Sequence, residues 1–184
     1  MKKLILLALF AYATSSTTIA QIELKINPIG LLFNSPDLSA EYIVNEDIGV
    51  EFGLGLEYGT QALTDYDRSG FNVFVAGKYY FSPDDGADKF YAGAYLRPRS
   101  RKITDNDDDG FDFGYKQSAF AAGVLIGYKW VGARGILFEL ALGGGRAFGD
   151  KFTWNDGDNS GEADGFGVDF LGRLAVGYRF GGDK

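Results

Sequence analysis

The sequence predicts an all-β fold, namely an eight-stranded antiparallel up-and-down transmembrane β-barrel with a filled polar interior. The first observation is an alternation, clearest from Ile48 to Tyr58, in which every second residue is apolar and the others are small or charged. A period of two places successive side chains on opposite faces of a strand. The second observation is that this pattern recurs about eight times along the chain, and the third is an apparent export signal before it. Together these observations are typical of a barrel in an outer membrane.

The chain begins with the features of a secretory signal peptide. Lys2 and Lys3 precede an apolar run from Leu4 to Ala13, and a stretch rich in small and hydroxyl-bearing residues then ends at Ala20. This order of basic, apolar and small-residue regions is that of a cleaved signal. A retained anchor is the alternative, but the apolar run is shorter than the ~20 residues that a spanning helix needs. We therefore expect residues 1–20 to be a cleaved signal peptide and residues 21–184 to form one barrel domain.

Eight segments of the mature chain carry the alternation. Most are close to the ~9–11 residues with which a tilted strand crosses a bilayer. Pro28 interrupts the first segment, and a proline is tolerated at a strand edge or a bulge. In the fifth segment, Tyr91 and Tyr95 share the polar face with the arginines. The predicted strands are residues 22–33, 38–44, 48–58, 71–81, 90–102, 114–130, 136–148 and 166–180.

The connections between these segments alternate in length. The odd connections are mostly long and the even ones are shorter, although the first has only a few residues. Outer-membrane barrels have short periplasmic turns and longer extracellular loops, so we expect both termini on the periplasmic side. The predicted connections are residues 34–37, 45–47, 59–70, 82–89, 103–113, 131–135 and 149–165.

The two faces of the strands differ in a way that favours lipid outside. The polar face is rich in glycine, which suits a narrow lumen where it leaves room for long charged neighbours, whereas a soluble exterior is normally rich in Lys, Glu and Thr. A soluble lipocalin-like barrel with an apolar cavity is the alternative. The apolar faces also tend to end in aromatic residues, as expected of girdles at the two membrane interfaces. These aromatics are Tyr58, Tyr79, Phe81, Phe90, Tyr128, Trp130, Tyr178 and Phe180.

The polar face predicts a paired charge network that fills the lumen. Charges withdrawn from water must be paired, and eight strands give an interior just wide enough for side chains to fill. We expect Glu51 and Glu57 to find partners among Arg97, Arg99, Arg173 and their neighbours. A proton or ion path through the lumen is the alternative. The expected acids are Glu23, Glu41, Glu51, Glu57, Glu139 and Asp169, and the expected bases are Lys25, Lys78, Arg97, Arg99, Arg101, Lys129, Arg173 and Arg179.

Two stretches resemble parts of known barrels. Residues 25–33, KINPIGLLF, followed by LSAEY at 38–42, resemble the opening of a family of small bacterial outer-membrane barrels of unknown function. The mature chain is similar in architecture to the OmpA/OmpX-type eight-stranded barrels. Residues 173–180, RLAVGYRF, are similar to the closing strand by which such proteins are recognised for assembly, although four residues follow it here. The resemblance implies an outer-membrane location and contact with the barrel-assembly machinery, and it transfers no catalytic residues.

Two acidic stretches have the spacing of the start of a calcium loop. Asp105, Asp107 and Asp109 precede Gly110, and Asp156 and Asp158 precede Gly161. A calcium loop of this kind ends in a bidentate Glu at position 12, where these stretches have Lys116 and Gly167. Neither is therefore an EF-hand. Weak surface binding of calcium is the alternative to solvated loops, and we expect no other cofactor.

Composition narrows the function classes. The chain has no histidine and no cysteine, which removes the commonest general base, the commonest metal ligand and any disulfide. The net charge of −7 leaves no electrostatic case for nucleic acid. We expect a non-enzymatic, monomeric outer-membrane barrel with a structural or surface-interaction role, which presents acidic extracellular loops to an envelope or extracellular partner. The alternatives are a narrow channel or small-ligand transport barrel, and a soluble secreted binder of apolar ligands.

Overall fold

Antiparallel strands close into a barrel in the computed structural model, which describes residues 21–32, 34–61, 64–84, 86–105, 114–156 and 159–181. The predicted signal peptide, residues 1–20, lies outside the described residues. The first elements are β1 (Gln21–Ile26), α2 (Pro28–Leu32), β2 (Asp37–Asn45), β3 (Ile48–Gln61) and β4 (Thr64–Tyr80). They are followed by β5 (Lys89–Asp105), β6 (Gly114–Val131), β7 (Ile136–Asp156), β8 (Asn159–Asp164) and β9 (Val168–Phe180).

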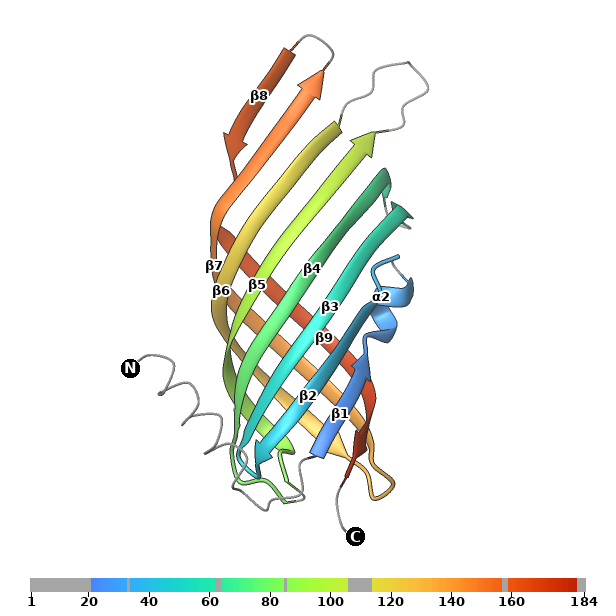
Figure 1. Cartoon of the computed structure of the whole chain (residues 1–184), viewed down its shortest axis with the longest axis vertical. Coiled ribbons are helices and arrows are strands. Elements are labelled where there is room, and N and C mark those ends of the chain that lie inside the picture. The colour runs from blue at the N-terminus through green and yellow to red at the C-terminus, as the bar shows by residue number, and fades with distance from the viewer. Residues whose placement is uncertain are drawn as a thin grey trace, which may run out of the picture.

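The strands form a ring with eight positions, which we call staves. Neighbours from β1 to β7 pair antiparallel in chain order, and β9 closes the ring by pairing with both β7 and β1 (Figure 1). The lower part of β7, Ile136–Arg146, pairs with β9, and its upper part, Lys151–Asp156, pairs with β8. Because β8 and β9 follow one another along the same side of β7, they make a single stave. The predicted all-β, up-and-down barrel of antiparallel strands is confirmed.

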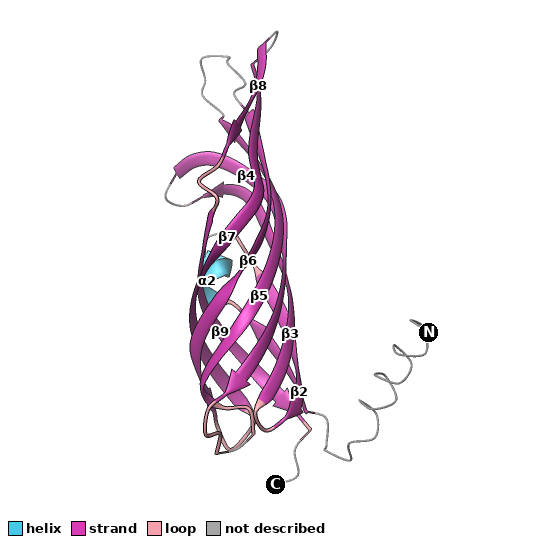
Figure 2. Ribbon diagram, turned by 90° about the vertical axis from the view of Figure 1, so that its left-hand side faces the viewer, coloured by secondary structure: helices cyan, strands magenta, loops and turns pink. Residues whose placement is uncertain are grey.

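The two ends of the barrel are built differently. At what we call the lower end lie the turns at residues 46–47 and 132–135 and the turn residues 81–84 and 86–88, together with the start of β1 and the end of β9 (Figure 1). At the upper end the strands continue as hairpins (Figure 2). The strands reach different heights around the ring, since β7 has 21 residues and β1 has only 6. One side of the upper rim therefore stands much higher than the other.

Two predicted long connections are largely strand. The pairing of β3 with β4 continues to Gln61↔Thr64, inside the predicted loop 59–70. The pairing of β7 with β8 continues to Asp156↔Asn159, inside the predicted loop 149–165. Few apolar residues mark these extensions, so the sequence shows no alternation there, although backbone hydrogen bonds keep the chains in register. Expectation and structure differ in strand length, and the order of the strands is as predicted.

The first predicted strand is too long at its C-terminal end. It stops at Ile26, and α2 occupies most of the remainder up to residue 32. Asn27 caps this helix, because its side-chain oxygen accepts hydrogen bonds from the backbone N–H groups of Ile29 at 3.1 Å and Gly30 at 3.2 Å. Pro28 takes the first helical position, where the missing N–H has no intrahelical partner to lose. Asn27 and Pro28 therefore start a helix, whereas the sequence predicted an interruption of the first strand at Pro28.

The two faces of the wall have opposite chemistry. On β3, Val50 and Phe52 are 45% and 48% exposed on the outer surface, while Glu51 between them is fully buried inside. Every stave presents large apolar side chains outward. No helix among the described residues is long and apolar enough to cross a membrane.

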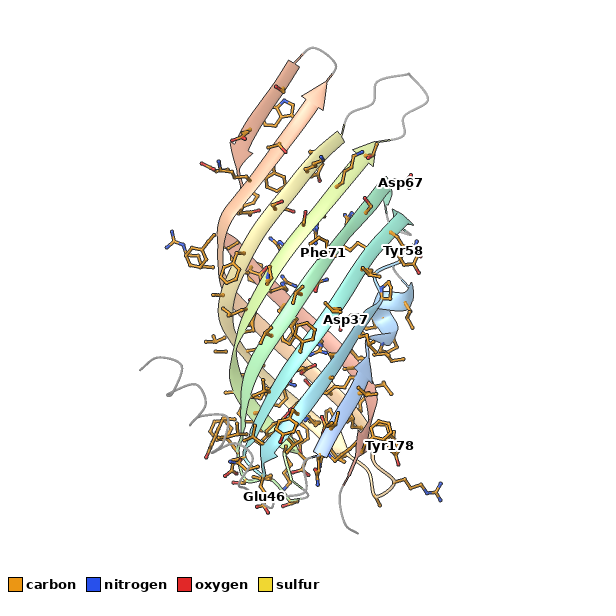
Figure 3. The ribbon with its side chains drawn as sticks, viewed as in Figure 1. Asp37, Glu46, Tyr58, Asp67, Phe71 and Tyr178 are labelled. Carbon is orange, nitrogen blue, oxygen red and sulfur yellow. The ribbon has the colours of Figure 1, made fainter. Side chains whose placement is uncertain are left out.

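Aromatic side chains gather at the lower end of the outer surface. Tyr128 contacts Trp130 with ring centroids 4.5 Å apart, and Tyr178 contacts Phe180 at 4.7 Å. Tyr79, Phe81 and Phe90 form a third group on the neighbouring staves. Seven of the eight predicted girdle aromatics lie at this end, and Tyr58 lies near the upper end (Figure 3).

Glycines of the inner face make room for a charged side chain at Gly49, which lies against the Glu41 carboxylate, and for tyrosine rings elsewhere, which the sequence did not suggest. A Cβ added at Gly127 would lie 2.5 Å from the Tyr91 hydroxyl oxygen, and one at Gly123 would lie 2.7 Å from the ring of Tyr95. Such distances are far below van der Waals contact, so a larger residue at these positions would push against the rings.

Candidate functional site: the charged interior

The lower half of the lumen holds a network of buried charges centred on Lys25. The Lys25 ammonium lies 2.6 Å from Glu139, 3.2 Å from Glu51 and 3.5 Å from Glu23, and it also pairs with Glu41. All five side chains are essentially inaccessible to solvent. The alternation of the strands explains why these five side chains lie close together, because each residue occupies an inward position of its stave. We call the lower network Glu23, Lys25, Glu41, Glu51, Lys78, Lys129, Glu139, Arg173 and Arg179.

Two further lysines bridge the same carboxylates. Lys78 of β4 lies 2.9 Å from Glu41 and 2.7 Å from Glu139. Lys129 of β6 lies 2.8 Å from Glu23 and 3.1 Å from Glu41. Each carboxylate in this network therefore contacts at least two cations, which is the condition under which buried charge is tolerated.

Two arginines of β9 connect the network to the place where β9 pairs with β1 and closes the barrel. Arg173 pairs with Glu51 at 2.5 Å and reaches Asp37 at 3.6 Å. Arg179 donates two hydrogen bonds to one oxygen of Glu23, from Nε at 2.9 Å and from Nη2 at 2.7 Å. Because Glu23 belongs to β1, this contact joins the first and last staves.

Tyrosines complete the network and were not predicted as part of it. The Tyr80 hydroxyl donates to Glu41, and the Tyr91 hydroxyl donates to Glu139 at 2.5 Å. The same rings lie under lysines, with Lys129 4.5 Å from the Tyr80 centroid and Lys78 4.6 Å from that of Tyr91. The sequence could have indicated these tyrosines by their inward positions. Tyr80 lies on the same face of β4 as Lys78, and Tyr91 lies on the same face of β5 as Gly93.

The turn between β4 and β5 closes the lower mouth. Ala87 is fully buried although it belongs to a turn, and its carbonyl accepts a hydrogen bond from Arg179 at 3.0 Å. Its backbone N–H donates to the Glu46 carbonyl at 2.7 Å. The turn therefore packs under the lower network and covers it from the lower end.

A second group of charges lies higher in the lumen. Asp169 of β9 is fully buried and accepts hydrogen bonds from Tyr95 at 2.7 Å, from Arg99 at 2.9 Å and from Arg97. We call Tyr95, Arg97, Arg99 and Asp169 the upper cluster. Above it, Arg101 pairs with Glu57 at 2.9 Å.

All fourteen charged residues that the sequence places in the interior face the lumen, and Glu57 pairs with Arg101, a neighbour of Arg99, as expected. Glu51 pairs with Arg173, as expected, yet Arg97 and Arg99 contact Asp169 and not Glu51. The register decides this, because a strand position fixes the height of a charge in the barrel. The fourteen residues are Glu23, Lys25, Glu41, Glu51, Glu57, Lys78, Arg97, Arg99, Arg101, Lys129, Glu139, Asp169, Arg173 and Arg179.

The carboxylates of the lower network have the spacing of a metal site, but lysines occupy it. Oxygen atoms of Glu41, Glu51 and Glu139 lie within 4.8 Å of one another. The ammonium groups of Lys25 and Lys78 each contact all three carboxylates. These ammonium groups supply the positive charge that a metal ion would otherwise supply.

The predicted calcium candidates fall almost entirely beyond what the structure describes. Asp107, Asp109 and Asp158 lie outside the described residues. Asp105 and Asp156 are the last residues of β5 and β7, and the positions of their side chains are not described.

No protein-family model matches the chain, and no curated protein matches it. Among solved structures, the chain is similar to a major outer membrane protein from Thermus thermophilus, with 15% sequence identity and a TM-score of 0.45. The similarity covers 88% of this chain and 99% of the other. At this level of similarity we infer neither fold nor function from the likeness.

Proposed function

We propose that this chain is a non-enzymatic barrel of a bacterial outer membrane with a structural or surface-interaction role. The observation that carries the proposal is the arrangement of charge, which is buried inside a closed ring whose outer surface is apolar on every stave. In a bilayer backbone polar groups must be satisfied internally, and strand pairing meets that condition around the ring except along residues 168–175 of β9, which have a strand on one side among the described residues. An apolar outer surface on this scale would be unfavourable in water.

The proposed orientation has the lower end and both termini in the periplasm. The short turns of the lower end and the hairpins of the upper end support it, because outer-membrane barrels have this asymmetry. The upper hairpins carry acidic groups, such as Glu162 and Asp164 of β8, which are exposed. These hairpins are the surface that we propose for an envelope or extracellular partner, and the acidic segments beyond the described residues are the proposed place for weak calcium binding.

The lumen serves, in this proposal, as a packed core and not as a conduit. The lower network is buried, its carboxylates contact lysines or arginines, and the turn at Ala87 covers it. A narrow channel is the second candidate. Planar-bilayer recording separates the two, since a packed lumen gives no stable unitary current, whereas reproducible single-channel steps would favour the channel.

Catalysis is not part of the proposal. The interior carboxylates that could act as acids or bases instead contact cations within the described residues, and these contacts occupy the lone pairs that a substrate would need. We propose no cofactor, no nucleic-acid partner, and a monomer surrounded by outer-membrane lipid. The aromatic end of β9 at Phe180 supports membership among OmpA/OmpX-like barrels and recognition by the barrel-assembly machinery.

Electrophoresis and fractionation test the proposal. We expect the folded protein to migrate differently from the boiled protein in a detergent gel, and to be recovered in the outer-membrane fraction. A soluble periplasmic product with no heat-dependent shift would contradict the membrane location and favour a soluble lipocalin-like barrel.

A further inference from the structure

The barrel wall lacks a strand beside the upper part of β9. β1 pairs with β9 only from Ile22↔Phe180 to Ile26↔Val176. Residues 168–175 of β9 pair with β7 on one side and have no strand on the other, among the described residues. The short helix α2, which follows β1, lies beside this edge (Figure 2). The wall is therefore closed by strands below this level and by a helix at it.

A side chain from the far wall satisfies one backbone group of this edge. The carbonyl of Phe170 accepts a hydrogen bond from Nη2 of Arg97 at 3.1 Å. Arg97 projects from β5, three staves away around the ring. The Phe170 side chain itself is 81% exposed on the outer surface, and nearby Phe166 is 99% exposed. The edge thus brings a guanidinium group close to the apolar exterior.

An apolar groove runs along the outer surface up to this edge. It has a volume of about 540 Å³ and is lined by Ile29 of α2, Gly172 and Leu174 of β9, Leu142 of β7 and Ile126 of β6. Gly172 leaves the base of the groove open, because a Cβ placed there would meet nothing within 4 Å. The groove volume is in the ~300–1,000 Å³ range of small-ligand sites, and Gly172 lies two residues after Phe170.

The upper cluster carries an excess of positive charge behind the free edge of β9, where Arg97 contacts Phe170, two residues before Gly172 of the groove. Arg97 and Arg99 share the single carboxylate of Asp169. The Nε atom of each arginine is buried without a hydrogen-bond partner. Both side chains keep some access to solvent, at 16% and 14% exposure. The partly exposed end of the Arg97 guanidinium can therefore donate a charge-assisted hydrogen bond to an anionic group of a ligand.

We propose that the groove and the free edge of β9 together bind an anionic phospholipid of the surrounding leaflet, with an acyl chain in the groove over Gly172 and the phosphate directed to Arg97. The inference rests on the proposed membrane location, which supplies the lipid. A partner strand fits less well, because the carbonyl of Phe170 on the free edge is already engaged by Arg97. The groove supplies apolar contact, and the arginine supplies the charge preference.

Native mass spectrometry of the detergent-solubilised full chain tests the site. The protein is titrated with phosphatidylglycerol or with phosphatidylcholine of identical chains. We expect one phosphatidylglycerol molecule to bind about tenfold more tightly than phosphatidylcholine, the effect of one charge-assisted contact. Arg97→Gln should abolish this preference. Gly172→Phe should weaken both lipids by filling the groove.

Gly77→Phe is the matched control, because Gly77 of β4 is also exposed and a Cβ there would meet nothing within 4 Å. It should bind both lipids as the unmodified protein does. Equal binding of the two lipids, or equal effects of Gly172→Phe and Gly77→Phe, would overturn the site. Displacement of phosphatidylglycerol by millimolar inorganic phosphate would also overturn it, since a free anion would then be the ligand.

The outcomes distinguish this inference from the membrane proposal. A protein that inserts into vesicles and shows the heat-dependent gel shift, yet has no phosphatidylglycerol preference, contradicts the lipid site alone. A protein that fails to insert contradicts both. If Arg97→Gln does not fold, the comparison of Gly172→Phe with Gly77→Phe decides.

Discussion

Replacing Lys25 by methionine should destabilise the barrel more than any other single loss of a lysine. Its ammonium group contacts all four glutamates of the lower network, at 2.6 Å for Glu139 and 3.2 Å for Glu51. Lys25→Met keeps an unbranched side chain that is one heavy atom shorter, and it removes the charge. The buried carboxylates then lose donors that water cannot replace. Removing one partner of a buried ion pair costs about 3–5 kcal/mol, so we expect a loss of that size in the free energy of unfolding.

Reversible urea unfolding in lipid vesicles, followed by tryptophan fluorescence, measures this loss. Lys151→Met is the control, because Lys151 and Glu162 form an ion pair at 3.4 Å with side chains 57% and 63% exposed. An exposed pair contributes at most about 1 kcal/mol. Combining Lys25→Met with Glu139→Gln should give a coupling energy of about 0.5–3 kcal/mol. If Lys25→Met cost no more than Lys151→Met, the lower network would not be a buried, mutually dependent unit.

Two further variants test local features of the wall. Gly127→Ala should lower the free energy of unfolding by about 1–3 kcal/mol, because the new methyl group would press on Tyr91, 2.5 Å away. Gly77→Ala is the control and should be close to neutral, since a Cβ there meets nothing within 4 Å. Equal unfolding midpoints of the two variants would contradict the tyrosine packing. Asn27→Ala should cost about 0.5–2 kcal/mol through loss of the α2 cap. Hydrogen exchange at the Ile29 and Gly30 amides checks the cap directly, and unchanged protection would show that it does not hold the helix.

The sequence was sufficient to predict the fold because a period of two assigns each strand residue to one of the two faces of the barrel wall. From Ile48 to Tyr58 each residue lies on the face that alternation assigned, with Glu51 buried and Phe52 exposed. Charge on the inward positions also implied that the lumen is filled. Local backbone chemistry was harder to read. Asn27 and Pro28 together start a helix, but a proline inside an apolar run also fits a strand bulge.

The partners inside the lumen depend on register, which alternation does not determine. Parity places Arg97 and Glu51 on the inner face but gives no relative height. The register from β3 through β5 puts Arg97 above Glu51, near Asp169. Tyr91 was visible on the polar face, but only the three-dimensional structure shows its hydroxyl on Glu139 and its ring filling the space over Gly127.

A charge placed on the apolar outer face tests whether that face meets lipid. Leu54 is 50% exposed in the middle of β3, while Tyr58 lies near the upper end of the same face. In a bilayer, Leu54→Arg should lower the free energy of unfolding by about 2–4 kcal/mol and Tyr58→Arg by about 0–1 kcal/mol, because the cost of an arginine falls toward the interface. Both are measured by urea unfolding in vesicles. In a soluble barrel an arginine at such an exposed position would change stability by no more than about 0.5 kcal/mol, and that result at Leu54 would show that the outer face does not meet lipid.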